Sequence, residues 1–338
     1  MNILVTMPKG EVRDTFFTTK SISCLESLGN VKYNPYDREY TSKELKEALK
    51  EVDIVFCCWG SAAYDEELLS HAPCLKVIAY CAGTVSGVAT PAVYKKGIAM
   101  LSANCVFAES VAESCICYTM VGLRRIEKYA NDVRSGLWRG KIFYNEGIMD
   151  RTVGIVGFGA IAKKFVGFLK PFRCNVLVHS SHLTKEEADE YGVTPVSLED
   201  VFANSDIVSI HLGFNEQTRH MIKREHLDQM KNGALLINTA RGGVIDEKEL
   251  IEVLKSERIN AVLDVLEEEP PASDSPFRTL KNVTVLPHMG GPTIDRRQYC
   301  VIKLVDDIKK LMTGEKKETL ETYIPEAHIA NMTKRNTK

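Results

Sequence analysis

The strongest constraint on the fold is a regular alternation of short β-branched runs with helix-like stretches along the whole chain. This alternation is typical of a parallel β-sheet covered by helices, because each crossover helix returns the chain to the start of the next strand. It excludes all-α and all-β folds. With 338 residues the chain is long enough for two domains with separate cores. The predicted fold class is therefore α/β, with two doubly wound parallel-sheet domains.

The strand-like runs fall into two series. A long, mostly apolar segment at 107–129 separates them and is predicted to be a helix that joins two domains. A helical stretch at 295–312 leaves room for the chain to return to the first domain, and the polar residues 333–338 are expected to fray. The first series has strands at 2–6, 53–57, 76–80 and 98–101, separated by amphipathic segments such as 42–49 and 65–70. The second has strands at 152–156, 175–179, 206–210, 234–238, 260–264 and 283–286.

Composition excludes several classes of function. The 43 basic and 45 acidic residues leave a formal charge of −2, so no global field would hold a polyanion or an anionic membrane. Nucleic acid is not expected as a main partner. The first ten residues contain an apolar run of only three, and no later run is expected to span a membrane. We therefore expect a cytoplasmic protein without a membrane partner.

The cysteines and histidines do not predict a metal site. The ten cysteines are scattered without a Cys-x-x-Cys pair, and several lie in apolar runs. We interpret these as small buried hydrophobic residues, among them Cys57, Cys58, Cys115 and Cys117. The histidines other than His288 show no spacing typical of metal ligands.

A glycine turn opens the second series of strands. The segment 153–162 reads strand, then Gly157-Phe-Gly159, then an apolar helical pattern. In this context Gly157 allows a tight turn, and Gly159 allows a pyrophosphate to approach the free N–H groups of the helix N-terminus at Ala160 and Ile161. Ala162 stands where a third glycine often lies, at a position that governs helix–strand packing. We predict a dinucleotide site here.

The end of the next strand leaves the choice of dinucleotide open. An acidic residue there would bind the ribose hydroxyls of NAD. The chain instead has Ser180 and Ser181 between two histidines, with Lys185 nearby. Because no carboxylate repels a 2′-phosphate, NAD and NADP are about equally expected. The alternative is a solvated loop that contributes little.

Polar residues collect after the later strands of the second series, where ligands bind in open parallel sheets. His211 follows the third strand, Arg241 the fourth, and His288 the sixth. The guanidinium of Arg241 can grip a carboxylate and the adjacent 2-oxo oxygen through its planar fork of donors. The imidazole of His288 can exchange a proton near neutral pH. Glu269, if it lies against His288, would fix the tautomer and favour the imidazolium.

Together these segments resemble the D-2-hydroxyacid dehydrogenase family over residues 76–293. The resemblance rests on the glycine turn, on Arg241-Gly-Gly-Val-Ile-Asp-Glu, on Asp264-Val-Leu-Glu-Glu-Glu269-Pro and on Pro287-His288. It implies an NAD(P)-dependent enzyme that interconverts a small 2-oxo acid and a D-2-hydroxy acid, with glyoxylate, hydroxypyruvate or a phosphoglycerate-type compound as substrate. The implied catalytic residues are Arg241, Glu269 and His288. The predicted cofactor-binding residues are Gly157, Gly159, Ala160, Ile161, Ser180, Ser181, His211, Thr218, Thr239, Ala240, Asp264 and Gly290.

The resemblance also implies how the chain is divided. Residues 1–101 with 293–338 would form a flavodoxin-like substrate-binding domain, and 102–292 a Rossmann dinucleotide-binding domain. Backbone N–H groups of Ala82, Gly83 and Thr84 would bind the substrate carboxylate, with Arg241 and His288 as further substrate contacts. A homodimer and domain closure near residues 102 and 292 are expected. Val85 and Gly213 depart from the family pattern, which puts the substrate in doubt.

Alternatives from other classes remain open. Some non-catalytic NAD(H)-sensing corepressors resemble the same family, as do dehydrogenases for formate or phosphite. The substrate side chain is also open, and its pocket is expected at residues 7–10, residues 59–61 and Tyr64. Lys9 and Arg13 could bind a second anionic group, although exposed basic residues in a loop are more common.

Overall fold

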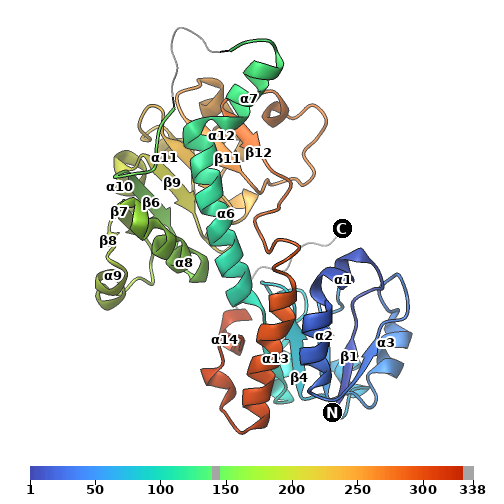
Figure 1. Ribbon diagram of the computed structural model, residues 1–338. Helices are drawn as coiled ribbons and strands as arrows, with labels where there is room; N and C mark the ends of the chain where they lie inside the picture. Colours follow the sequence, from blue (N-terminus) through green and yellow to red (C-terminus); the bar gives the residue numbers. More distant parts are fainter. Residues whose placement is uncertain (139–144, 330–338) are drawn as a thin grey trace. The chain divides into compact units, whose positions relative to one another are not determined.

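The structure is a computed structural model that describes residues 1–138 and 145–329, and the chain divides into two compact units. Unit 1 consists of Met1–Ala108 and Pro292–Lys338, and unit 2 of Glu109–Gly291. Each unit holds a parallel sheet of its own (Figure 1), so the predicted α/β class with two parallel-sheet domains is confirmed. The tail 333–338 lies outside the described residues.

The sheet of unit 1 has the order β2-β1-β3-β4-β5, with every neighbouring pair parallel. Its inner strands β3 and β4 are buried along their whole length, which explains why they read as continuous apolar runs. The strands are β1 Asn2–Val5, β2 Asn30–Tyr33, β3 Ile54–Cys57, β4 Val77–Tyr80 and β5 Ala99–Ser102. The helices between them are α1 Glu11–Phe16, α2 Thr19–Glu26, α3 Ser42–Ala48, α4 Glu66–Ser70 and α5 Pro91–Lys95.

The strand β2 is missing from the sequence prediction. It lies at the edge of the sheet, and its residues alternate between exposed and half-buried positions. An edge strand with that pattern lacks the apolar run that identifies a buried strand. The sequence analysis therefore did not consider the loop after β2 as part of a site. That loop begins at the same edge of the sheet as the loops after β1 and β3.

The C-terminal segment completes unit 1. Helix α13, Gln298–Met312, packs against α1 and α2, and it corresponds to the helix predicted at 295–312. The chain then runs along β5, where the N–H of Ser102 donates to the carbonyl of Thr322 at 2.7 Å. The buried carboxylate of Asp307 on α13 accepts hydrogen bonds from the N–H and the hydroxyl of Thr322, both at 3.0 Å. A short helix, α14 Glu326–Ile329, ends the described chain.

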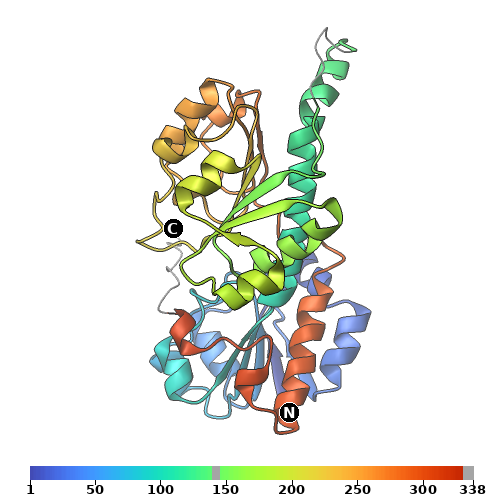
Figure 2. The same ribbon diagram turned by 90° about the vertical axis from the view of Figure 1, so that its left-hand side faces the viewer.

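The sheet of unit 2 has seven parallel strands in the order β12-β11-β10-β9-β6-β7-β8. The order reverses between β6 and β9, as in dinucleotide-binding sheets. Six strands were predicted, and the seventh, β8 Thr194–Pro195, is a two-residue edge strand. The others are β6 Thr152–Val156, β7 Asn175–His179, β9 Ile207–Ile210, β10 Leu235–Asn238, β11 Asn260–Leu263 and β12 Val283–Val285. The yellow-green strands lie side by side in Figure 2.

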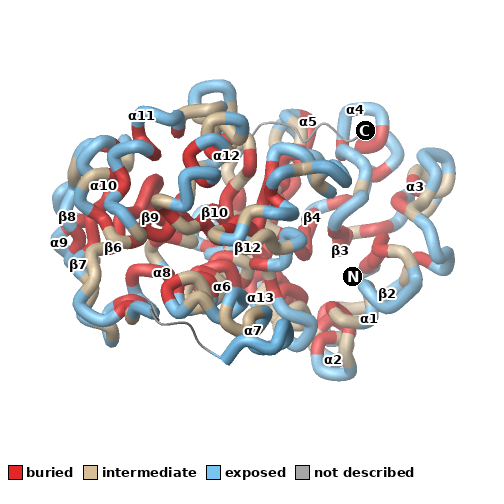
Figure 3. The backbone as a smooth tube through the Cα atoms, turned by 90° about the horizontal axis from the view of Figure 1, so that it is seen from above, coloured by how far each residue is buried: buried red, intermediate tan, exposed pale blue. Residues whose placement is uncertain are grey.

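Helices cover both faces of this sheet and bury two separate hydrophobic cores. Side chains of α6 and α8 pack on one face, and side chains of α10, α11 and α12 pack on the other. Figure 3 shows β6, β9 and β10 largely in the buried colour, with these two helix layers on either side. The helices are α6 Asn104–Arg124, α7 Ile126–Arg134, α8 Ala160–Leu169, α9 Lys185–Tyr191, α10 Leu198–Asn204, α11 Arg224–Leu227 and α12 Glu247–Lys255.

Helix α6 corrects three expectations. The predicted helix 107–129 is two helices, because Arg125 adopts a left-handed conformation with φ 49° and breaks the chain between α6 and α7. The expectation that no run reaches membrane-spanning length is also wrong, since α6 is long and apolar enough. Half of its most apolar stretch is buried inside the protein. Cys117 lies on the exposed face of α6, whereas Cys57, Cys58 and Cys115 are buried as expected.

Candidate active site

The glycine turn lies at the point where the strand order of unit 2 reverses. Gly157 follows β6 and adopts φ 91°, a conformation that glycine enters without strain. A Cβ atom at this position would lie 2.7 Å from the carbonyl oxygen of His211, which follows β9. Only glycine therefore allows the two loops to meet at the reversal point, where ligands bind in open α/β sheets.

The helix N-terminus after the turn is open. Gly159 is the N-cap of the ten-residue helix α8, and nothing lies within 4 Å of the position a Cβ would take. Gly159 and Ala160 are exposed, and Ile161 is half-buried. Ala162 is fully buried against the sheet, which agrees with a packing role for the third position of the motif. An exposed backbone at a helix N-terminus fits the pyrophosphate of a dinucleotide.

The loops that would hold the rest of the dinucleotide are ordered by their own hydrogen bonds. Ser180 is half-buried after β7 and accepts the N–H of His182 at 3.3 Å, while Ser181 is exposed. The Thr218 hydroxyl donates to the carbonyl of Gly213 at 2.7 Å and accepts the N–H of Asn215 at 2.9 Å, which closes the loop after β9. These contacts leave the choice between NAD and NADP as open as the sequence does.

His211 is held as a neutral imidazole. Burial lowers the pKa of His211 to about 4. Its Nε2 lies 2.9 Å from the hydroxyl of Ser209, its ring packs against Phe165, and its Nδ1 is buried without a hydrogen-bond partner among the described residues. A buried ring nitrogen without a partner is rare in folded proteins and agrees with a place beside a ligand site.

The low pKa of His211 predicts how stability depends on pH. Because the pKa of His211 is about 4 when folded and about 6.5 when unfolded, its contribution to stability is fully present above pH 6.5 and is lost as the pH is lowered toward 4. Between pH 7.5 and 5 the parent protein should lose about 2 kcal/mol of unfolding free energy that His211→Gln does not lose. Urea unfolding at both pH values measures this difference. His182→Gln, a change at an exposed histidine, should respond like the parent, and a parent response equal to that of His211→Gln would contradict the prediction.

The side chain of Asn238 shapes the loop that contains Arg241. The Asn238 amide group, at the end of β10, donates to the carbonyl of Arg241 at 3.0 Å and accepts the N–H of Ala240 at 3.0 Å. The Arg241 guanidinium donates to the carbonyl of Ala240. Thr239 is buried, with its hydroxyl 3.4 Å from the thiol of Cys115 on α6. Sequence reasoning missed the role of Asn238, for which the signal was an amide side chain closing a buried strand.

The loop after β10 touches the loop after β11 at Gly242. A Cβ at Gly242 would lie 1.9 Å from the carbonyl carbon of Leu266 and 2.2 Å from the backbone nitrogen of Glu267. No side chain fits between two backbones at that distance. The absence of a side chain at Gly242 therefore lets the Arg241 loop pack directly on the turn that carries Glu269.

Glu269 and His288 are in direct contact. The Nδ1 atom of His288 lies 2.8 Å from Oε2 of Glu269, the pairing that the sequence analysis hypothesised. The other carboxylate oxygen, Oε1, accepts the N–H of Leu266 at 3.1 Å, which orients the carboxylate toward the ring. Both side chains are partly exposed, His288 by 34% and Glu269 by 39%. A carboxylate bound to Nδ1 leaves Nε2 as the ring nitrogen that can exchange a proton.

A buried carboxylate holds the backbone that carries His288. Asp264 accepts the N–H of Met289 at 2.8 Å and that of Gly290 at 2.9 Å, and its carbonyl accepts the N–H of His288 at 2.9 Å. His288 itself has φ 54°, a left-handed conformation that costs energy for a residue with a side chain. Asp264 was predicted as a cofactor contact, which stays a prediction, and in the structure it supports this strained turn.

Helix α6 supplies two further supports that sequence reasoning missed. The Tyr118 hydroxyl donates to Asp264 at 3.2 Å, and the Ser114 hydroxyl donates to the carbonyl of Gly290 at 3.0 Å. Burial and the charge of Asp264 raise the pKa of Tyr118, so its hydroxyl stays protonated and donates. The signal was two polar residues four positions apart in a mostly apolar helix, because residues at that spacing lie on one helical face.

A second histidine also meets carboxylates in this loop. His220 contacts Glu267 through Nε2, and its Nδ1 lies 3.7 Å from Asp246. The Glu267 N–H donates to the carboxylate of Glu247, whose pKa is raised by burial and by the charges of Glu267 and Glu269. Glu267 therefore holds the turn that carries Glu269 in place.

The predicted carboxylate-binding loop lies in unit 1. The Ser102 hydroxyl is 2.7 Å from the carbonyl oxygen of Ala82 and 2.6 Å from that of Gly83. Among the described residues, the N–H groups of Ala82 and Gly83 meet no hydrogen-bond acceptor. Thr84 is half-buried beside them. Two adjacent N–H groups without acceptors suit an anion, so the loop remains the predicted carboxylate site.

Of the two basic residues considered as a second anion site, Lys9 is exposed, whereas Arg13 has structural contacts. The Arg13 guanidinium donates to the carbonyl of Asn34 at 2.8 Å and lies over the ring of Tyr33. Its side chain is 13% exposed. Arg13 therefore stabilises the edge of unit 1. Among the described residues no group of His, Cys, Asp and Glu has the arrangement of a metal site.

Comparisons with known proteins agree with this geometry. The family described as "D-isomer specific 2-hydroxyacid dehydrogenase, NAD binding domain" matches residues 116–290. Glyoxylate/hydroxypyruvate reductase B of Yersinia pestis is 33% identical over 285 residues, which cover 81% of this chain and 85% of that protein. The chain belongs to this family. The family and the class of enzyme predicted from the sequence, an NAD(P)-dependent 2-hydroxyacid dehydrogenase, are confirmed.

Two further relatives extend the comparison. D-3-phosphoglycerate dehydrogenase of Methanocaldococcus jannaschii is 32% identical over 322 residues, which cover 95% of this chain but only 59% of that protein. The solved structure of a glyoxylate reductase from Paecilomyes thermophila is 26% identical, with a TM-score of 0.75 and coverage of 96% of this chain and 98% of that one. The chain thus spans about three fifths of the length of the archaeal protein.

Proposed function

We propose that the protein reduces a small 2-oxo acid to the D-2-hydroxy acid, and catalyses the reverse reaction, with the proton handled by His288. The contact between His288 Nδ1 and Glu269 Oε2 at 2.8 Å carries this proposal, because it leaves Nε2 to donate a proton to the developing alkoxide. Glu269 stabilises the imidazolium before the transfer. Arg241 orients the substrate carboxylate and polarises the 2-oxo group through its planar fork.

The open helix N-terminus at Gly159 and the left-handed turn at Gly157 fit a nicotinamide dinucleotide, which supplies or accepts the hydride when bound. We propose that Ala160 and Ile161 bind its pyrophosphate through their N–H groups and that Ser180 and Ser181 meet its adenosine ribose. The loop at Ala82, Gly83 and Thr84 remains the proposed carboxylate-binding segment. The remaining proposed cofactor contacts are His211, Thr218, Thr239, Ala240, Asp264 and Gly290.

The relatives suggest which substrates to test first. The names of the bacterial reductase and the archaeal dehydrogenase point to glyoxylate, hydroxypyruvate and 3-phosphohydroxypyruvate. We further propose a cytoplasmic homodimer, which light scattering of the purified protein would test. The support is membership of the family, and a monomer at micromolar concentration would contradict the dimer.

The test is the loss of absorbance at 340 nm with NADH or NADPH and a panel of 2-oxo acids. We expect turnover with at least one small 2-oxo acid. Because no carboxylate follows β7 to repel a 2′-phosphate, kcat/KM for NADPH over NADH should exceed about 0.1, and a ratio below about 0.001 would contradict this. Binding of the dinucleotide without any turnover would favour the non-catalytic sensor instead.

A further inference from the structure

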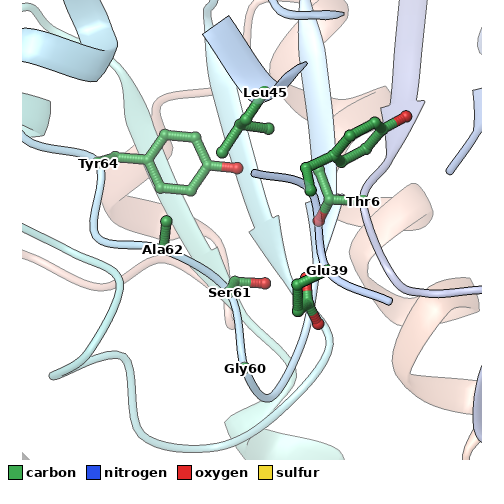
Figure 4. A pocket seen from close by; sticks show the side chains of 8 residues that line it. Thr6, Glu39, Leu45, Gly60, Ser61, Ala62 and Tyr64 are labelled. Atoms are coloured by element: carbon green, nitrogen blue, oxygen red, sulfur yellow. The ribbon is translucent and has the colours of Figure 1, made fainter. Parts of the chain in front are cut away.

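Unit 1 contains a cavity of about 100 Å³ beyond the carboxyl ends of β1, β2 and β3. Such a volume holds several waters, or a terminal group of a few heavy atoms. It includes Gly60, Ser61 and Tyr64, which were expected to line a substrate pocket, but not residues 7–10 or Trp59. The full lining consists of Thr6, Glu39, Tyr40, Leu45, Gly60, Ser61, Ala62 and Tyr64 (Figure 4).

The cavity holds a carboxylate without a counter-charge. Glu39 is half-buried, and burial raises its pKa. Among the described residues, no cation or hydrogen-bond donor pairs with its carboxylate. Its neighbour Arg38 is engaged elsewhere, with two N–H groups that donate to Glu44 at 2.9 Å each. A partly buried carboxylate without a partner costs free energy, which a bound cation would recover.

The carboxylate of Glu39 lies close to a glycine. A Cβ at Gly60 would lie 3.0 Å from Oε1 of Glu39, so the carboxylate rests over the bare backbone of the loop after β3. Figure 4 shows the hydroxyl of Ser61 directed toward the Glu39 side chain. The charge of Glu39 also raises the pKa values of Cys58 and Tyr64, after the larger effect of their burial. These observations place the carboxylate at the cavity.

The chemistry of the lining selects one kind of occupant. Glu39, Ser61 and Thr6 offer acceptor oxygens, and Tyr40 and Tyr64 offer aromatic rings. A guanidinium is planar, carries a positive charge, has five N–H donors and no acceptor, and stacks on aromatic rings. An ammonium has the charge but not the planar shape. The cavity is therefore complementary to a guanidinium.

We propose that this cavity binds the guanidinium end of a 2-oxo acid whose side chain ends in that group. The cavity and the predicted carboxylate loop at Ala82 and Gly83 lie at the same edge of one sheet, where β3 separates β4 from β1. Neighbouring strands are about 4.8 Å apart, so the two sites are separated by roughly 5–10 Å along this edge. An acid with three methylene groups between its oxo carbon and its guanidinium spans that interval. This inference rests on the proposed function for its substrate class.

Binding tests the cavity without requiring turnover. Calorimetry of the full chain with 5-guanidinopentanoate, which has no oxo group, should give a Kd at least 10-fold lower for the parent than for Glu39→Gln. Asp37→Asn is the matched control, because it removes one negative charge from an exposed position two residues away. It should bind like the parent. An equal Kd for the parent and Glu39→Gln, or no binding to the parent at millimolar ligand, would overturn the proposal.

Kinetics separates this proposal from the proposed function. The parent should have a kcat/KM at least 10-fold higher for 5-guanidino-2-oxopentanoate than for 5-ureido-2-oxopentanoate, which has the same shape without the charge. This ratio should fall to about 1 in Glu39→Gln. If small 2-oxo acids are reduced but the parent's ratio is about 1, the cavity proposal fails and the function stands. If nothing is reduced but the calorimetric difference is present, the function fails and the cavity proposal stands.

Discussion

Replacing His288 with alanine is expected to lower kcat for a 2-oxo acid by roughly 10²–10⁴-fold, while the affinity for the dinucleotide is kept. The physical reason is that the developing alkoxide then has no proton donor at the end of the Glu269–His288 pair, whose atoms are 2.8 Å apart. Steady-state turnover followed at 340 nm gives kcat, and quenching of nicotinamide fluorescence gives the affinity.

His220 offers a matched control for this change. It is also a histidine in contact with a carboxylate of the same loop, Glu267, but it has no proposed part in the proton transfer. His220→Ala should keep kcat within about 10-fold of the parent. Unchanged turnover in His288→Ala, or an equal loss in both variants, would show that the proton comes from another group.

Gly242→Ala is expected to lower the free energy of unfolding by about 3 kcal/mol or more. The added methyl group would overlap the backbone of Leu266 and Glu267, at 1.9 Å and 2.2 Å, and neither can move aside as a flexible side chain would. The Arg241 loop and the Glu269 turn must therefore separate. Urea unfolding of the parent and the variant gives the difference, and residual folded protein should also show reduced turnover.

Gly167→Ala is the control for the same chemical change. Gly167 lies within α8, and nothing is within 4 Å of its Cβ position. In a helix interior, alanine raises the free energy of unfolding by about 0.5–1 kcal/mol relative to glycine. This variant should therefore be as stable as the parent or slightly more stable. A Gly242→Ala protein with the parent's unfolding midpoint would mean that the two loops are not packed as the structure describes.

The main features of the fold could be predicted because buried strands leave local patterns, and the groups proposed to react were chosen from similar patterns. Buried parallel strands are continuous apolar runs, so most strands of both sheets were located to within one residue. The polar residue that follows such a run must lie at the carboxyl edge of the sheet. That rule alone led to His211, Arg241 and His288, whereas the contact of Glu269 with His288 was a separate hypothesis about the acidic loop after β11.

What escaped prediction depends on contacts between segments that are distant in sequence. The edge strand β2 has no apolar run, so Glu39 after it was overlooked although it lies at the same sheet edge as Ser61. The tight packing at Gly242 and the support of the His288 turn by Asp264 also require knowing which backbones meet. The break at Arg125 is a single residue in an unusual conformation, for which helical periodicity gives no warning.

The loops after β10, β11 and β12 are packed and hydrogen-bonded to one another. This arrangement has an evolutionary consequence. Asn238, Gly242 and Asp264 connect these loops within unit 2, whereas Glu39 and its cavity belong to unit 1. Mutations that alter the cavity need not disturb the groups proposed to transfer the proton. A library that varies Glu39, Tyr40 and Ser61 should therefore yield variants with new substrate ranges far more often than one that varies the loops of unit 2.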